Sequence, residues 1–204
     1  MTVSYSEWID FTFGLSGQTT PSLIRGDQIK GTAEEISEYC TRFLKTSPEV
    51  LRNIPHDNAK AALWELPGIN GYLGLLSYDQ LSFATRQALA EIQFNLFRDS
   101  FQIDDFDGAV FMWWEHLLGA EWQDSKPVGD DQQICEIIVS TLERIVSLPS
   151  EVCQRSGLHG LKEFSHTVEP GRTDSVFRHF RASALAVNGE VEKYATAAAE
   201  GDVP

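Results

Sequence analysis

One helix-spaced set of side chains in this sequence has the chemistry to bind a metal ion: His159, Glu163 and His166. Offsets of four and three residues place all three on one side of a helix. Glu163 and His166 also match half of the carboxylate-bridged di-iron pattern, but no other histidine follows a glutamate by three residues. Because Gly157 and Gly160 indicate close packing, we expect His159 to be buried between helices without a metal. A helical metalloenzyme using these three residues is the alternative.

Three further patterns look like ligand or catalytic sites, and each lacks an essential feature. When the acidic segment 103–108 is aligned as a calcium loop on Gly108, Ile103 occupies the first ligand position. Trp114 then stands at the twelfth position, where a bidentate glutamate is required. The glycines at 68–74 are spaced G-x-x-G-x-x-G, which is not the spacing of a dinucleotide-binding loop. A G-x-S-x-G nucleophile elbow is missing as well, so no catalytic residue is predicted.

The densest aromatic patch contains two adjacent tryptophans, Trp113 and Trp114. Neighbouring residues on a helix point about 100° apart, so a single core does not easily bury both. Either the helix is sandwiched between neighbours, or one tryptophan lies in a groove that binds a partner, where aromatic anchors are favoured. We keep Trp113 as a candidate partner-binding residue.

The strongest global signal is negative charge. The chain has 30 acidic against 16 basic residues, a formal net charge of −14. Such a surface repels nucleic-acid phosphates and anionic membranes, and it attracts a basic protein. Solubility alone is the competing explanation. We expect partner-binding carboxylates in two connections between helices: Asp104, Asp105 and Asp107 in the first, and Glu121, Asp124, Asp130 and Asp131 in the second.

The cysteines and the hydrophobic runs predict a cytoplasmic protein. Cys40, Cys135 and Cys153 form no C-x-x-C pair and lie on apolar stripes, as buried free thiols do in a reducing compartment. The N-terminal segment lacks the basic and apolar regions of a secretory signal. The longest near-apolar run, 109–120, contains two polar residues and is too short to span a bilayer. No cofactor is predicted.

Apolar residues recur at helical spacing along most of the chain, and period-two alternation is absent. Thr32 and Glu35 form a capping-box pattern, and Ser47-Pro48 is typical of a helix start. Start signals precede the stripes at these positions: Thr32, Ser47, Asp57, Ser77 (capped with Gln80), Asp107, Asp130, Ser150, Thr173 and Asn188. The sequence predicts a single all-α domain over residues 1–204, more than half helical.

The stronger starts, at Thr32, Ser77, Asp130 and Thr173, are 45, 53 and 43 residues apart. This spacing favours stacked helix pairs of HEAT or armadillo type, whose repeats are about 40–47 residues long. A compact irregular helical bundle is the alternative.

The segments PSEVCQRSGLHGLKEFSH and EKYATAAAEG resemble the C-terminal end of uncharacterised bacterial HEAT-like helical proteins. The resemblance covers about a quarter of the chain, implies the stacked fold and brings no catalytic residues. The expected function is a non-enzymatic, acidic protein-binding module. An immunity- or antitoxin-like inhibitor of a basic protein is one specific form of it.

Overall fold

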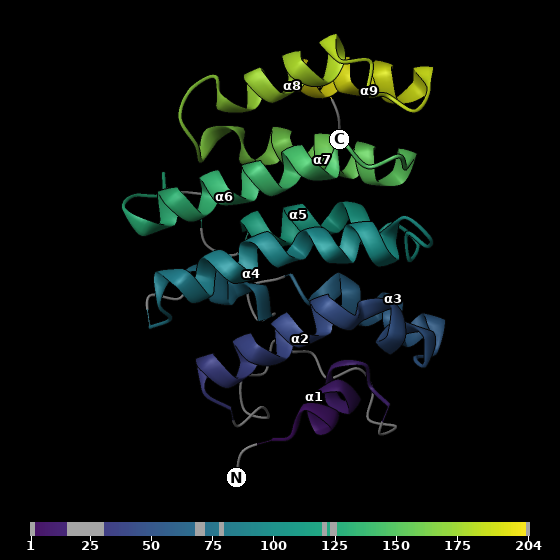
Figure 1. Ribbon diagram of the computed structural model, residues 1–204, viewed down its shortest axis with the longest axis vertical. Coiled ribbons are helices and arrows are strands. Elements are labelled where there is room, and N and C mark those ends of the chain that lie inside the picture. The colour runs from purple at the N-terminus through teal and green to yellow at the C-terminus, as the bar shows by residue number, and fades with distance from the viewer. Residues whose placement is uncertain are drawn as a thin grey trace.

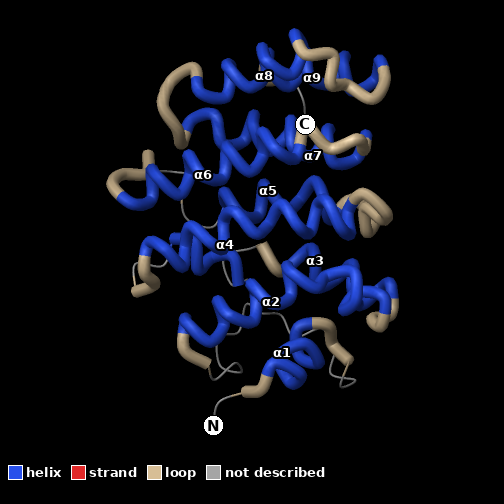
Figure 2. Tube along the Cα trace, in the orientation of Figure 1, coloured by secondary structure: helices blue, strands red, loops and turns tan. Residues whose placement is uncertain are grey.

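The computed structural model describes residues 3–15, 31–67, 72–77, 80–119, 122 and 126–202. Within these ranges 73% of the residues are helical and none forms a strand (Figure 2), which confirms the all-α prediction. The α-helices are α1 (Tyr5–Thr12), α2 (Ala33–Arg52), α3 (His56–Glu65), α4 (Phe83–Leu96), α5 (Ala109–Gly119), α6 (Asp130–Ile145), α7 (Glu151–Glu163), α8 (Arg172–Ala182) and α9 (Gly189–Glu200). Shorter turns of helix are η1 (Tyr72–Ser77), η2 (Phe97–Phe101) and η3 (Phe164–His166).

The helices lie in two rows. Helices α2, α4 and α6 pack side by side in one row, and α3, α5, α7 and α9 pack in the other. Figure 1 shows the pairs α2–α3, α4–α5, α6–α7 and α8–α9 as successive layers, with α1 beneath the first. The turn inside each pair lies at the right edge of this view, and the connections between pairs lie at the left edge. Helix α1 and the α8–α9 layer therefore lie at opposite ends of the molecule.

Capping residues begin several helices where the sequence predicts them. Thr32 and Glu35 form the expected capping box, and the Ser150 and Asn188 side chains accept backbone N–H groups at the starts of α7 and α9. The predicted cap at Ser77 is wrong, because η1 ends there. The N-cap of α4 is Ser82, whose Oγ accepts the N–H of Thr85 at 3.2 Å.

Two other helix starts differ from the sequence prediction. Helix α8 begins at Arg172, with Gly171 as N-cap in a left-handed conformation (φ 83°), instead of at Thr173. The carboxylate of Asp107 pairs with Lys60 Nζ at 2.8 Å, and α5 begins two residues later, at Ala109. Residues with positive φ turn the chain into both helices. Before α8 this residue is Gly171, and before α5 the residues are Asp107 (φ 52°) and Gly108 (φ 90°).

Helix α2 is kinked in the middle. Thr46 has non-helical angles (φ −122°, ψ 21°), two residues before Pro48. Proline has no N–H to donate to the preceding turn, and its ring crowds the carbonyl four residues earlier. The predicted helix start at Ser47-Pro48 is therefore a break between two helical halves. The break gives the second half of α2 its own direction.

The α5 tryptophans are both buried, so the sandwich interpretation is right and Trp113 is not a surface anchor. Trp113 is 1% exposed and its Nε1 donates to Gln93 Oε1 of α4 at 2.8 Å. Trp114 donates through Nε1 to Ser156 Oγ of α7 at 3.0 Å. Two helices therefore take up the two side chains, α4 from the other row and α7 from the same row, and each indole N–H finds a polar partner inside the core.

Small residues let α7 approach its neighbours closely. A Cβ on Gly160 would lie 2.6 Å from Leu142 Cδ2 and 2.8 Å from Trp114 Cγ. A Cβ on Gly157 would lie 2.7 Å from Val146 Cγ1. Hydrogen is thus the only substituent that fits at either position without movement of a neighbour.

In the described part of the chain, no helix combines the length and apolar character needed to cross a lipid bilayer.

Candidate functional site

The structure does not bring the three residues of the candidate metal set, His159, Glu163 and His166, into one site. Helix α7 ends at Glu163, so His166 falls in the following 3-10 turn and leaves the helical register. Glu163 Oε1 pairs with Lys162 Nζ at 2.7 Å, and His166 Nε2 lies 3.4 Å from the carbonyl oxygen of Trp122. Across the described ranges, no three His, Cys, Asp or Glu side chains are grouped closely enough to hold a metal ion.

His159 is buried, as predicted, but its partners come from distant helices. It is 3% exposed, and its Nε2 lies 2.8 Å from Glu115 Oε1 of α5. Its Nδ1 lies 3.4 Å from the hydroxyl of Tyr194 in α9. Burial raises the pKa of Tyr194, with the charge of Glu115 adding to the effect and that of Arg155 opposing it. This polar chain joins α5, α7 and α9, and it satisfies a histidine that would otherwise be buried alone.

Of the predicted acidic residues, Asp104, Asp105 and Asp107 lie in the turn between α4 and α5. Asp104 Oδ2 is 3.2 Å from His56 Nε2, and its Oδ1 accepts the N–H of Phe106 at 2.8 Å. Asp105 Oδ1 accepts the N–H of Asp107 at 3.1 Å. The hydrogen bond and the charge of Lys60 lower the pKa of Asp107. Asp107 therefore has a cationic partner, whereas Asp104 faces a histidine and Asp105 a backbone amide.

The second predicted group does not join the first. Figure 1 places the start of α6, with Asp130 and Asp131, at the edge opposite the α4–α5 turn. Asp130 is exposed, but Asp131 pairs with the guanidinium of Arg86, a buried side chain of α4. Asp131 thus neutralises an internal cation. Glu121 and Asp124, from the same predicted group, lie outside the described residues.

A pocket of about 340 Å³ lies beside the acidic turn. Its inner wall consists of largely buried side chains, Leu51, Ile54, Ser100 and Phe106. The mouth combines apolar and charged groups: Pro48, Arg52, His56, Asp99, Ile103 and Asp104. The kinked half of α2, the π-turn η2 and the α4–α5 turn each supply part of the lining. This pocket is the candidate functional site, because apolar pockets with a few polar groups are where proteins usually bind ligands.

The backbone beside the pocket is unusual in two ways. Residues 97–101 form a π-turn, a rare conformation that often marks functional sites. Phe106 (φ 49°) and Asp107 (φ 52°) are consecutive non-glycine residues in the left-handed region, which costs free energy. Stacking of the Phe106 and His56 rings, 5.5 Å apart, supports this conformation. The sequence shows neither feature, because both depend on contacts between residues about 50 positions apart.

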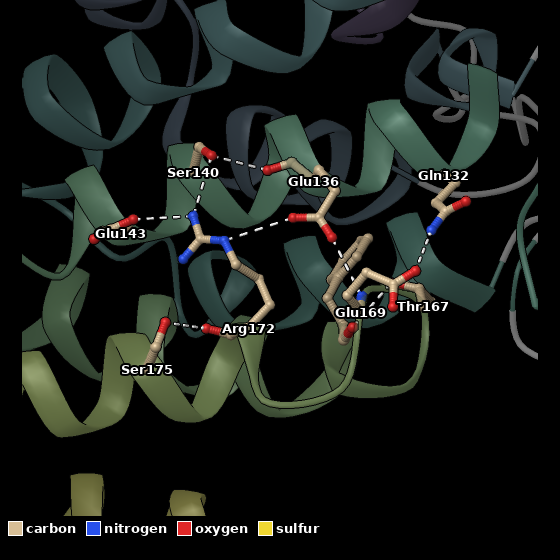
Figure 3. Close-up of polar contacts among 9 residues, drawn as sticks. Gln132, Glu136, Ser140, Glu143, Thr167, Glu169, Arg172 and Ser175 are labelled. Carbon is tan, nitrogen blue, oxygen red and sulfur yellow. Dashed lines mark hydrogen bonds and ion pairs between the residues drawn. The ribbon is translucent and has the colours of Figure 1, made fainter. Parts of the chain in front are cut away.

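A polar cluster that sequence reasoning missed joins α6 to the start of α8 (Figure 3). Arg172 approaches Glu143 Oε2 at 3.0 Å and Glu136 Oε2 at 3.5 Å, and it donates to Ser140 Oγ at 3.3 Å. Glu136 in turn accepts the backbone N–H of Glu169 at 3.2 Å. One arginine thus holds two carboxylates of α6. The cluster fixes the connection between the third and fourth pairs and leaves its groups already partnered.

Searches of protein-family models, of curated proteins and of solved structures each found no match to this chain.

Proposed function

We propose that this chain is a non-enzymatic, acidic protein-binding module whose partner presents a basic surface. The observation that carries the proposal is the composition of the turn at residues 102–108, which has three aspartates and no lysine or arginine. Among the described residues, the ion-pair partner of Asp104 is a histidine, which is positively charged only when protonated, and the carboxylate of Asp105 accepts a backbone amide. On a chain of net charge −14, these carboxylates offer a cationic partner favourable contacts.

The architecture we propose for this module is a HEAT-like stack of helix pairs. The two rows of helices and the regular alternation of turns between the two edges support it. In such a stack each pair contacts mainly its neighbours, so the ends open more easily than the middle. Hydrogen exchange in low urea should therefore show terminal pairs opening at lower free energy than α4–α7. Uniform opening of all helices would favour an irregular bundle instead.

One specific form of this function is an immunity- or antitoxin-like inhibitor. The acidic composition supports it, since an inhibitor of a basic toxin such as a nuclease benefits from opposite charge and fast association.

The test begins with capture of partners by the full chain and identification by mass spectrometry. Association of the purified partner is then measured at low and at physiological salt with the wild type and with an Asp104→Asn, Asp105→Asn double variant. We expect the variant to lower the association rate at least threefold and to weaken its salt dependence. A matched control, Glu192→Gln with Glu200→Gln, removes the same charge from exposed positions in α9. Equal rates for wild type and variant would assign these aspartates to solubility.

A further inference from the structure

We infer that the pocket beside the acidic turn receives one large apolar side chain of the partner, next to a lysine or arginine in the partner's sequence. This inference rests on the proposed function, and it specifies the chemistry of the segment that is bound. The pocket supplies an apolar wall, and Asp104 and Asp105 supply the negative charge beside it.

The size of the pocket suits a side chain. At about 340 Å³ it is at the lower end of the range for small-molecule sites, which is about 300–1,000 Å³. The wall formed by Leu51, Ile54 and Phe106 is apolar, so it gains free energy when an aliphatic or aromatic group displaces water from it. The one polar atom deep in the wall, Ser100 Oγ, already bonds Ser47 Oγ at 2.9 Å. An apolar group therefore leaves no donor unpaired there.

The pocket is already formed in the unbound chain. The α2 kink turns Leu51 and Ile54 toward the π-turn, and the Ser47–Ser100 hydrogen bond fixes the two walls to each other. The left-handed pair at Phe106 and Asp107 turns the chain back at the far side. A preformed site avoids the entropy cost of ordering on binding.

The mouth of the pocket favours a partner that is both apolar and basic. Ile103 is 82% exposed, so a docked chain would cover an apolar side chain that is now in water. Around this edge, two carboxylates form no ion pair with a lysine or arginine within the described residues, namely those of Asp104 and Asp105. Arg52 is the one described cation here without a carboxylate partner. Unpaired carboxylates therefore outnumber unpaired cations at this edge. A bound segment with a lysine or arginine beside its apolar residue is preferred over one with an acidic residue there.

Three capped pentapeptides test the inference by NMR titration of the ¹⁵N-labelled full chain: Gly-Lys-Trp-Lys-Gly, Gly-Glu-Trp-Glu-Gly and Gly-Lys-Gly-Lys-Gly. We expect the first to shift the amide signals of residues 49–54, 56 and 99–106 and to bind at least fivefold more tightly than the other two. The acidic peptide loses the charge contact, and the third loses the apolar anchor. Equal binding of the three, shifts elsewhere only, or preference for the acidic peptide would overturn the inference.

Substitutions at exposed positions provide a second arm that does not endanger folding. Ile103→Ser should weaken the binding of the Gly-Lys-Trp-Lys-Gly peptide at least threefold. Val128→Ser, at a position 78% exposed just before α6, should leave the affinity for this peptide unchanged. An unchanged affinity for Ile103→Ser would also overturn the inference. The proposed function is judged separately, by salt-dependent association of a protein partner. It survives if the peptides fail, and it falls if no basic partner binds through Asp104 and Asp105.

Discussion

Several single side chains with the chemistry for binding serve the fold instead. Asp131 neutralises Arg86, Trp113 donates its indole N–H inside the core, and His159 connects three helices. Each was a candidate on residue type and local spacing, but its partner lies 20 to 45 residues away, where sequence spacing gives no signal. Burial of His159 was predictable from Gly157 and Gly160, whereas the identity of Glu115 and Tyr194 as its partners was not.

Loss of the Asp131 carboxylate should destabilise the protein. Asp131→Asn leaves the buried Arg86 cation without its counter-charge, which costs several kcal/mol in fully buried pairs. Because Asp131 is 36% exposed, solvent screening reduces this, and we expect a loss of about 1–2 kcal/mol. Urea unfolding measures it. Asp130→Asn, the same change one residue earlier at an exposed position, should stay within about 0.5 kcal/mol of wild type; equal losses would contradict the pairing.

A methyl group at Gly160 should also destabilise the protein. Alanine favours a helix by about 0.5–1 kcal/mol over glycine, but its Cβ would press against Leu142 and Trp114. Overpacking of this kind costs about 1–3 kcal/mol, so Gly160→Ala should lower stability in thermal or urea unfolding. Gly189→Ala is the control, because a Cβ there meets nothing within 4 Å. A stabilised Gly160→Ala variant would mean that α7 packs less closely than described.

Buried thiols should make stability fall at alkaline pH. Burial raises the pKa of Cys135 to about 12 and that of Cys153 to about 11, from an ordinary value of 9.0. The folded chain therefore holds protons that the unfolded chain releases above pH 9. The stability contribution is complete below pH 9 and declines as pH rises toward 11. Between pH 8 and 10 we expect a loss of roughly 1 kcal/mol per thiol. A Cys135→Ala, Cys153→Ala variant should lose less over the same interval, measured by urea unfolding.

At the scale of helices, prediction succeeds where the signal is local. The Thr32–Glu35 capping box depends on residues within one turn and is present, and the helix start predicted at Ser47-Pro48 is found as a kink inside α2. The start of α4 was misplaced because Ser77 and Ser82 both offer a capping hydroxyl before the same apolar stripe. The choice between them depends on where the preceding 3-10 turn ends, which tertiary packing decides.

One amide side chain holds the connection that leads into the last helix. Gln154 of α7 is buried, donates through Nε2 to the Leu185 carbonyl at 2.8 Å and accepts the Val187 N–H at 3.0 Å. Gln154→Glu removes the donor and places a carboxylate against a carbonyl oxygen. We expect amides in 185–198 to exchange with solvent about tenfold faster, as loss of one buried hydrogen bond implies. Gln133→Glu adds the same charge at an exposed site in α6 and should leave this exchange unchanged.

For the whole molecule, the all-α class follows from helical periodicity along the chain. The pocket does not follow, because its lining comes from residues 48–56 and 99–106, which the sequence places in different helices. The sequence indicated only the acidic edge of the pocket, through Asp104 and its neighbours. The position of the start of α6, at the edge opposite the α4–α5 turn, required the three-dimensional path of the chain.

The net charge should make global stability depend on salt. Like charges repel in a compact chain of −14, and dissolved ions screen that repulsion. We expect the thermal midpoint to rise between 20 and 500 mM NaCl. A Glu192→Lys, Glu200→Lys variant reduces the repulsion at exposed sites, so its midpoint should rise less. A midpoint independent of salt would indicate that the ion pairs compensate for the excess charge.

The placement of the first and last helices has a mechanical consequence. Helices α1 and α9 belong to opposite end layers, so a force applied through them pulls along the direction in which the layers follow one another. Layers then peel from the ends in turn. Release of the α8–α9 layer, residues 172–200, frees a length of up to about 100 Å of extended chain, at roughly 3.5 Å per residue. Under tension the protein would lengthen in steps, one layer of helices at a time.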